Sequence, residues 1–119
     1  MYFFDTYALF ELIKGNRQYD KYKGYALKVC VLNIAELYWG LIKDVGMEES
    51  DKWLQKYKFE IITIDYNLIL SAVKFRYEHK KQDISLTDSI GYLLAKKYGL
   101  KFLTGDKEFE NFPNVEFVK

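Results

Sequence analysis

Five short apolar segments alternate with longer stretches of helical spacing, and this alternation constrains the fold more than any other feature of the sequence. The apolar segments are residues 2–4, 29–31, 61–64, 102–103 and 115–118. Strands that are separated by helices pair in parallel, because the chain crosses back over the sheet before it enters the next strand. The sequence therefore predicts an α/β sandwich built on a parallel sheet of about five strands.

Local signals place helices between these segments. Gly15 is typical of a helix end and predicts a helix over residues 6–14, while Gly46 closes a helix whose apolar positions run from residue 34 to residue 42. Helical spacing continues in four further stretches, which are residues 17–28, 48–57, 66–80 and 86–98. Asp65 and Ser85 stand immediately before the last two stretches and are predicted to cap them.

The composition is typical of one folded domain, and we predict a single domain over residues 1–119. Half of the residues are hydrophobic and the net charge is +1, which excludes disorder and a strong overall attraction to nucleic acid. The lone cysteine, Cys30, cannot form an internal disulfide and favours a reducing, cytoplasmic location. No apolar run is long enough to span a membrane, and Asp5 stands where a secretory signal would carry basic residues.

Four acidic residues from distant segments are expected at the carboxyl edge of the sheet, where parallel α/β proteins carry their chemistry. Asp5 and Asp106 follow the first and fourth predicted strands, while Glu36 and Asp88 lie in the first turns of predicted helices. Carboxylates that lie close together repel one another, and a divalent cation removes that repulsion. Oxygen ligands suit Mg²⁺ or Mn²⁺, whereas one histidine and one cysteine cannot form an ordinary zinc site.

Each acid also has an ordinary structural explanation. Asp88 stands three residues after a serine in the pattern of a capping box, and Asp5 can cap the helix that follows it. Glu36 can be a solvated acid, and Asp106 can be a turn residue. Asp65 follows a strand as well, but helix capping explains it better, so we leave it out of the predicted site. Four acids at one edge favour a shared cation over four separate structural roles.

The residues around these acids resemble the PIN domain family, and more narrowly the VapC-type toxin ribonucleases. The resemblance rests on residues 3–6, 33–40, 86–90 and 102–109, which read FFDT, NIAELYWG, LTDSI and FLTGDKEF. It implies a three-layer α/β/α fold around the parallel sheet and Mg²⁺- or Mn²⁺-dependent cleavage of RNA. It also assigns the acidic catalytic and metal-binding pocket to Asp5, Glu36, Asp88 and Asp106.

Neighbouring residues both follow and depart from the family pattern. Thr6 and Thr104 resemble the hydroxyl residues that support the acids. Tyr7 stands where many relatives have a small polar residue. Glu108 replaces a second aspartate that some relatives carry, and it could reach the metal directly or act through other groups.

The sequence as a whole predicts a metal-dependent endoribonuclease that is the toxin of a VapBC-type toxin–antitoxin pair. RNA is then the substrate, and the resemblance implies an antitoxin protein and a second copy of the chain as partners. One alternative is a PIN-like module that binds RNA or protein without cleavage. Another is a phosphoacceptor receiver domain with Asp65 as acceptor, which is disfavoured because Asp5 has no acidic neighbour and the fifth strand ends with the chain.

Three tyrosines recur at every third position between the first helix and the second strand. Tyr19, Tyr22 and Tyr25 can form a partly buried helix face, a base-stacking surface or a groove for a partner. The resemblance favours the groove, and it predicts that an antitoxin segment lies against these tyrosines.

Overall fold

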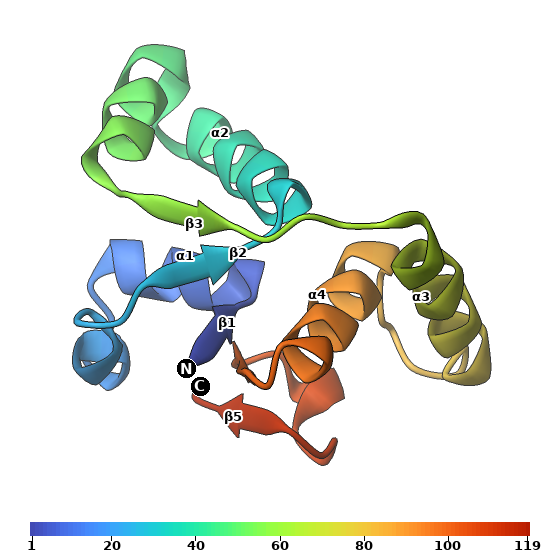
Figure 1. The fold of residues 1–119 in the computed structure, drawn as a ribbon. Helices are drawn as coiled ribbons and strands as arrows, with labels where there is room; N and C mark the ends of the chain where they lie inside the picture. Colours follow the sequence, from blue (N-terminus) through green and yellow to red (C-terminus); the bar gives the residue numbers. More distant parts are fainter.

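The computed structural model describes all 119 residues and contains a five-stranded sheet with helices on both faces (Figure 1). The strands are β1 (Tyr2–Phe4), β2 (Leu27–Val29), β3 (Phe59–Ile61), β4 (Lys101–Thr104) and β5 (Val115–Phe117). They lie in the order β3-β2-β1-β4-β5, and every pairing is parallel. The predicted parallel α/β sheet is therefore confirmed.

The helices fall close to their predicted positions. They are α1 (Thr6–Lys14), α2 (Val31–Lys56), α3 (Tyr66–Glu78) and α4 (Leu86–Lys97), with short 3₁₀ helices η1 (Arg17–Tyr22) and η2 (Lys107–Phe109). Gly15 ends α1 with a φ of 83°, and Gly46 divides α2 into two helical parts with a φ of 84°. Both angles lie in the left-handed region that glycine adopts without strain. None of the helices combines the length and the apolar character that crossing a membrane requires.

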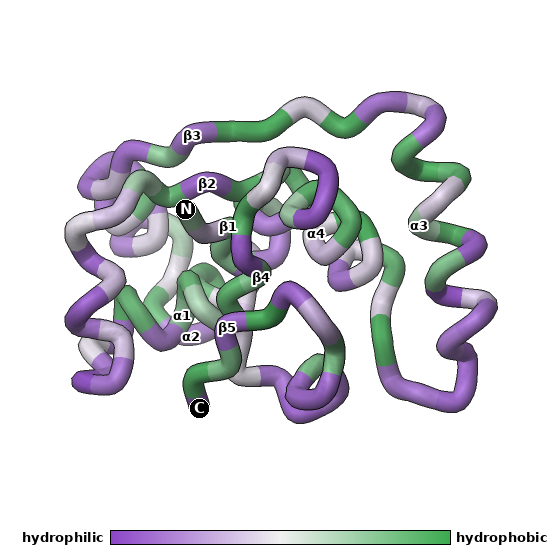
Figure 2. The backbone as a smooth tube through the Cα atoms, turned by 60° about the horizontal axis from the view of Figure 1, so that its bottom comes forward, coloured by the Kyte–Doolittle hydropathy of each residue, from purple (hydrophilic) through white to green (hydrophobic).

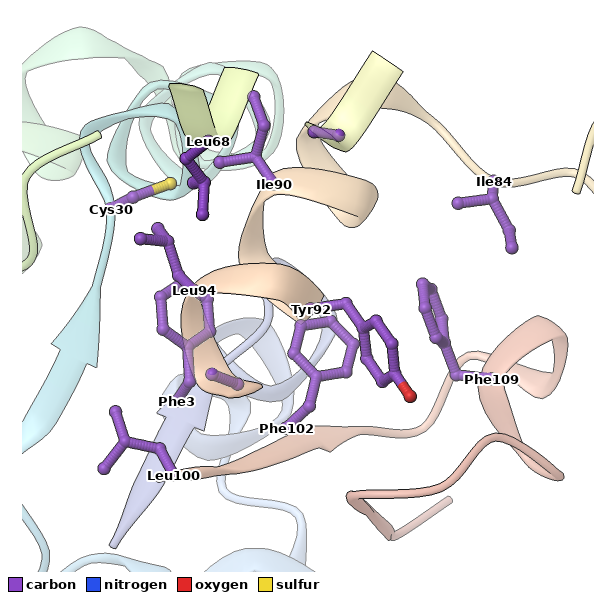
Figure 3. Close-up of a cluster of buried hydrophobic side chains, with 12 residues drawn as sticks. Phe3, Cys30, Leu68, Ile84, Ile90, Tyr92, Leu94, Leu100, Phe102 and Phe109 are labelled. Carbon is purple, nitrogen blue, oxygen red and sulfur yellow. The ribbon is translucent and has the colours of Figure 1, made fainter. Parts of the chain in front are cut away.

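The central strands supply two cores because adjacent strand residues point to opposite faces of a sheet. Phe3 and Phe102 pack with α3 and α4 on one face, as Figure 3 shows for the cluster around them. Phe4 and Leu103 pack with α1, η1 and α2 on the other face. The three-layer arrangement that the resemblance implied is therefore confirmed.

The second strand lies earlier than its apolar run predicts. Residues 29–31 were expected to form it, but β2 begins at Leu27, and α2 already begins after Cys30. The side chain of Asn33 accepts a hydrogen bond from the Cys30 backbone N–H at 3.0 Å, which fixes the start of the helix there. Because β2 begins early, the helix predicted over residues 17–28 is also shorter and is limited to η1.

The third strand is displaced in the same direction. Residues 61–64 were expected to form it, but β3 ends at Ile61, which lies opposite Val29 at the end of its only neighbour, β2. Residues 62–64 form the connection to α3 instead, and this connection is largely green in Figure 2 because it is apolar. The Ile62 N–H still donates to the Val29 carbonyl at 2.7 Å, and the apolar run then continues beyond the end of the strand.

The tyrosine-rich segment after α1 is largely core. Tyr19 and Tyr22 are fully buried, and their hydroxyls donate hydrogen bonds to the Val118 carbonyl and to Glu116 Oε2, each at 2.6 Å. The prediction that an antitoxin segment lies against these two tyrosines is therefore wrong, because they connect η1 to the C-terminal strand. Tyr25 alone of the three is exposed.

Candidate active site

A chain of hydrogen bonds links the ends of the two central strands at the carboxyl edge of the sheet. Asp5 directly follows β1 and is only 3% exposed, and its Oδ2 accepts a hydrogen bond from Thr104 Oγ1 at 2.7 Å. The same Thr104 oxygen accepts from the Asp106 backbone N–H at 3.1 Å. Asp5 is the N-cap residue of α1, but its side chain makes no capping bond. Its carboxylate is therefore committed to Thr104 and not to the helix.

Glu36 is oriented by a second chain of hydrogen bonds. Thr6 Oγ1 donates to Glu36 Oε1 at 2.6 Å, and Asn33 Nδ2 donates to Thr6 Oγ1 at 3.1 Å. Asn33 is fully buried and is itself fixed by the Cys30 N–H. Sequence reasoning did not include Asn33 among the site residues. The sequence feature that could have identified Asn33 is its position one helical turn before Glu36, where an amide side chain faces the strand ends.

Asp88 takes part in the predicted capping box and still faces the other acids. Ser85 Oγ accepts from the Asp88 N–H, and Asp88 Oδ2 accepts from the Ser85 N–H, both at 3.0 Å. Burial raises the pKa of Asp88 above its usual value, and the charges of Asp106 and Glu36 add to the increase. The capping role uses Oδ2 and leaves Oδ1 outside the box.

The electrostatic surroundings of Asp5 are unfavourable to its charge. Burial raises the pKa of Asp5 to about 8, with further increases from the charges of Asp88 and Asp106, although the Thr104 hydrogen bond lowers it. The ion pairs of the protein join lysines to Glu11, Asp20, Glu49, Glu60 and Asp65, and none involves the four predicted site acids. The acids therefore influence one another without a compensating basic side chain from this chain.

The donor set suits a hard divalent cation, because it consists of carboxylate and hydroxyl oxygens. In this conformation no group of three or more acidic, histidine or cysteine side chains is arranged to hold a metal ion. Mg²⁺ commonly keeps several of its waters and binds through only one or two protein carboxylates. The charge of Asp106 raises the pKa of Asp5, so the two carboxylates lie near enough to interact and are a pair of that kind. Thr104 connects the two residues, because its hydroxyl donates to the Asp5 carboxylate and accepts from the Asp106 backbone N–H. The residues present therefore fit such an ion.

Glu108 contacts the site through its backbone. Its N–H donates to Asp106 Oδ1 at 3.0 Å, whereas its carboxylate Oε1 accepts from the Asp83 backbone N–H at 3.1 Å. Its side chain thus attaches the segment before α4 to η2. Asp65, which was left out of the predicted site, caps α3 by accepting from the Leu68 N–H at 2.7 Å, as predicted.

Comparison with known proteins identifies both the family and the fold. The sequence matches the PIN domain family over residues 2–115. Similar solved structures are a toxin–antitoxin complex from Klebsiella pneumoniae (24% identity, TM-score 0.76), the sarcin–ricin loop cleaving toxin VapC20 from Mycobacterium tuberculosis (16%, 0.73), and VapBC2 from Rickettsia felis bound to a promoter DNA fragment (20%, 0.75). The alignments cover 98% of this chain and 96%, 99% and 96% of those chains. No curated protein matches the sequence.

Proposed function

This chain belongs to the PIN domain family, and from that premise we propose that it is a Mg²⁺- or Mn²⁺-dependent endoribonuclease, the toxin of a toxin–antitoxin pair. The observation that carries the proposal is the buried carboxylate of Asp5, which lies among other acids with no basic partner. A carboxylate in that setting needs a positive charge from outside the chain to remain ionised at neutral pH. A bound divalent cation provides that charge.

In the proposed site, Asp5 and Asp106 hold the ion most directly, and Glu36 and Asp88 complete the pocket. When bound, a divalent cation activates water for attack on a phosphodiester and neutralises charge on the phosphate. Thr104 keeps the Asp5 carboxylate in place through Oδ2. Thr6 occupies Oε1 of Glu36, so Oε2 is the atom that can accept a proton from an attacking water. The expected products carry a 5′-phosphate and a 3′-hydroxyl.

The similar structures support RNA as substrate and an antitoxin as partner. VapC20 is a toxin that cleaves the sarcin–ricin loop, and two further relatives, from Rickettsia felis and Salmonella typhimurium, are VapBC proteins with bound DNA. Each has the fold of this chain over nearly its whole length, with TM-scores of 0.73 to 0.75. We extend RNA cleavage and an antitoxin partner to this chain because it has the same fold and carries its acids at the carboxyl edge of the sheet.

The proposed homodimer has support from exposed apolar side chains. Val31 at the start of α2 and Tyr66, Ile69 and Leu70 in the first half of α3 are all exposed to solvent. A second copy that covers them would remove this apolar surface from water. Light scattering at micromolar concentration should give the mass of a dimer, and a strictly monomeric mass would contradict this part of the proposal.

The direct test of the proposed function is cleavage of a labelled single-stranded RNA by the purified protein. We expect cleavage with Mn²⁺ or Mg²⁺ and none in EDTA, with activity restored when the ion is added back in excess. Analysis of the product ends should find 5′-phosphates. Cleavage that persists in EDTA would contradict metal dependence, and RNA binding without any cleavage would favour the non-catalytic PIN-like module.

A further inference from the structure

A pocket of about 490 Å³ opens between the C-terminal half of α3 and the segment that leads into α4. Val73, Arg76 and Tyr77 line it from α3, and Asp83 and Leu86 line it from the opposite side. In Figure 1 this segment runs back from the end of α3 to the start of α4. The proposed nuclease mechanism uses none of these side chains.

One wall of this α3 pocket adjoins the acidic site. The Asp83 N–H donates to Glu108 Oε1 at 3.1 Å, and the Glu108 N–H donates to Asp106 Oδ1 at 3.0 Å. Leu86 precedes Asp88 by two residues on the first turn of α4. Two hydrogen bonds therefore connect the lining of the pocket to a carboxylate of the proposed site.

The pocket is lined by two basic side chains that form no ion pair, Arg76 and Lys80, and by one acidic residue, Asp83. Arg76 Nε donates to the carbonyl of Ile84 at 3.1 Å, and the Ile84 side chain is anchored in the core (Figure 3). That bond holds the guanidinium in place, and its terminal nitrogens make no ion pair within the chain. Lys80 also makes no ion pair, and its Nζ lies 4.3 Å from the centre of the Tyr77 ring, which remains 68% exposed. A guanidinium fork matches the geometry of a phosphate.

A second basic pocket lies at the wrong edge of the sheet to act with the acids. It has a volume of about 570 Å³ and is lined by Lys23, Lys56 and Lys58 together with the first residues of β2 and β3. The acids follow the carboxyl ends of the strands, so the sheet separates them from this second pocket. A third pocket, lined by Gln18, Lys21 and Lys119, adjoins the carboxyl end of β5. The α3 pocket differs from both because hydrogen bonds through Glu108 connect its lining to the Asp106 carboxylate.

We propose that the α3 pocket binds a nucleotide next to the scissile phosphate of single-stranded RNA. Arg76 and Lys80 contact a backbone phosphate, and a base stacks on Tyr77. This inference rests on the proposed function, because it takes RNA as the substrate. Two unpaired cations beside an exposed aromatic ring match a phosphate and a base, and this combination favours RNA over a second copy of the chain as the occupant.

The test is binding of fluorescein-labelled oligouridylate to the metal-free protein in EDTA, followed by anisotropy over a series of salt concentrations. Each phosphate contact on single-stranded nucleic acid contributes about 0.7 to the slope of log K against log salt. We expect Arg76→Gln and Lys80→Gln each to lower the slope by about 0.7. Tyr77→Ser should weaken binding roughly tenfold without a change in slope, because stacking releases no counterion.

Lys74→Gln is the matched control, since Lys74 lies on α3 outside the pocket, and it should leave the slope unchanged. Lys80→Gln breaks no side-chain hydrogen bond but does remove the contact of the ammonium with the Tyr77 ring. Tyr77→Ser removes the same contact without removing a charge, so only a lower slope in Lys80→Gln reports a phosphate contact. Slopes equal to that of the parent for both Arg76→Gln and Lys80→Gln would overturn the inference. So would a Tyr77→Ser variant that dissociates a dimer in light scattering and binds RNA like the parent.

Cleavage by the parent protein with Mn²⁺ separates the two proposals. If the parent cleaves RNA and the slopes do not change, the pocket assignment fails and the nuclease proposal stands. If the slopes change as expected and the parent does not cleave, the nuclease proposal fails and the pocket is supported as an RNA-binding site.

Discussion

Asp5 and Asp65 stand in the same local setting, each after an apolar segment and each as the N-cap residue of the next helix. Asp65 accepts from the Leu68 N–H and pairs with Lys97 at 2.9 Å, and the lysine is the main cause of its lowered pKa. Asp5 makes neither kind of bond, is buried, and has a raised pKa. The comparison teaches that the partners of an aspartate at a strand end, and not its place in the sequence, distinguish a capping acid from an acid that is a candidate for metal binding.

The largest expected difference between these two positions is in catalysis. Asp5→Asn should lower RNA cleavage at least about a hundredfold, because it removes a charge that faces the proposed ion. Asp65→Asn should retain nearly full activity, because that carboxylate is already neutralised by Lys97. Initial rates on one labelled RNA in Mn²⁺ measure both. Equal losses in the two variants would mean that the site lies elsewhere.

The second-largest difference between Asp5 and Asp65 is expected in how the free energy of unfolding depends on pH. The pKa of Asp5 in the folded protein, about 8, lies above its ordinary value of 3.8, so the folded state binds this proton more tightly. Its contribution to the free energy of unfolding is therefore fully present below about pH 4 and is lost as the pH rises through about 8. In EDTA, Asp5→Asn should become more stable than the parent by on the order of a few kcal/mol between pH 5 and pH 8.

The contribution of Asp65 to stability should depend on pH in the opposite direction, and Asp65→Asn therefore serves as the control. Its pKa is lowered, so its contribution is present above its ordinary value and is lost as the pH falls through the lowered one. Urea unfolding at several pH values should show that Asp65→Asn follows the parent from pH 5 to pH 8. An Asp5→Asn variant whose stability ran parallel to that of the parent over this range would contradict the raised pKa.

Sequence reasoning selected three of the four proposed site acids because each of these follows a recognisable local pattern. Asp5 and Asp106 follow strands, and Asp88 completes a capping box, and all of these signals lie within a few residues. The bond between Thr104 and Asp5 joins residues 99 positions apart, so the burial and raised pKa of Asp5 depend on sheet closure. The core positions of Tyr19 and Tyr22 depend in the same way on the C-terminal strand.

The strand boundaries were missed for a related reason. The apolar run that ends β2 continues into the first turn of α2, and hydropathy cannot show where the backbone changes direction. The bond from the Cys30 N–H to Asn33 decides that point, and it also orients Thr6 and therefore Glu36. One buried amide thus sets both a fold boundary and the position of a proposed site residue.

An intermediate effect is expected from the hydroxyl that supports Asp5. Thr104→Val removes the donor to Asp5 Oδ2 and the acceptor for the Asp106 N–H, which should cost about 1–3 kcal/mol of stability at pH 7. Because that hydrogen bond lowers the pKa of Asp5, its loss should raise the pKa further. Thr104→Ser keeps the hydroxyl and should restore most of the stability. Equal destabilisation by valine and serine would indicate that the methyl group, and not the hydrogen bond, is what matters.

The smallest effect is expected at Asp65, where capping and ion pairing can be separated. Asparagine caps a helix nearly as well as aspartate, and an exposed ion pair contributes little, so Asp65→Asn should melt within about 2 °C of the parent. Asp65→Ala removes the acceptor for the Leu68 N–H and should lower the melting temperature by about 5 °C. Differential scanning calorimetry of both variants at pH 7 makes the measurement. If asparagine and alanine destabilise equally, the ion pair with Lys97 dominates at this position, and the charge of Asp65 matters more than its cap.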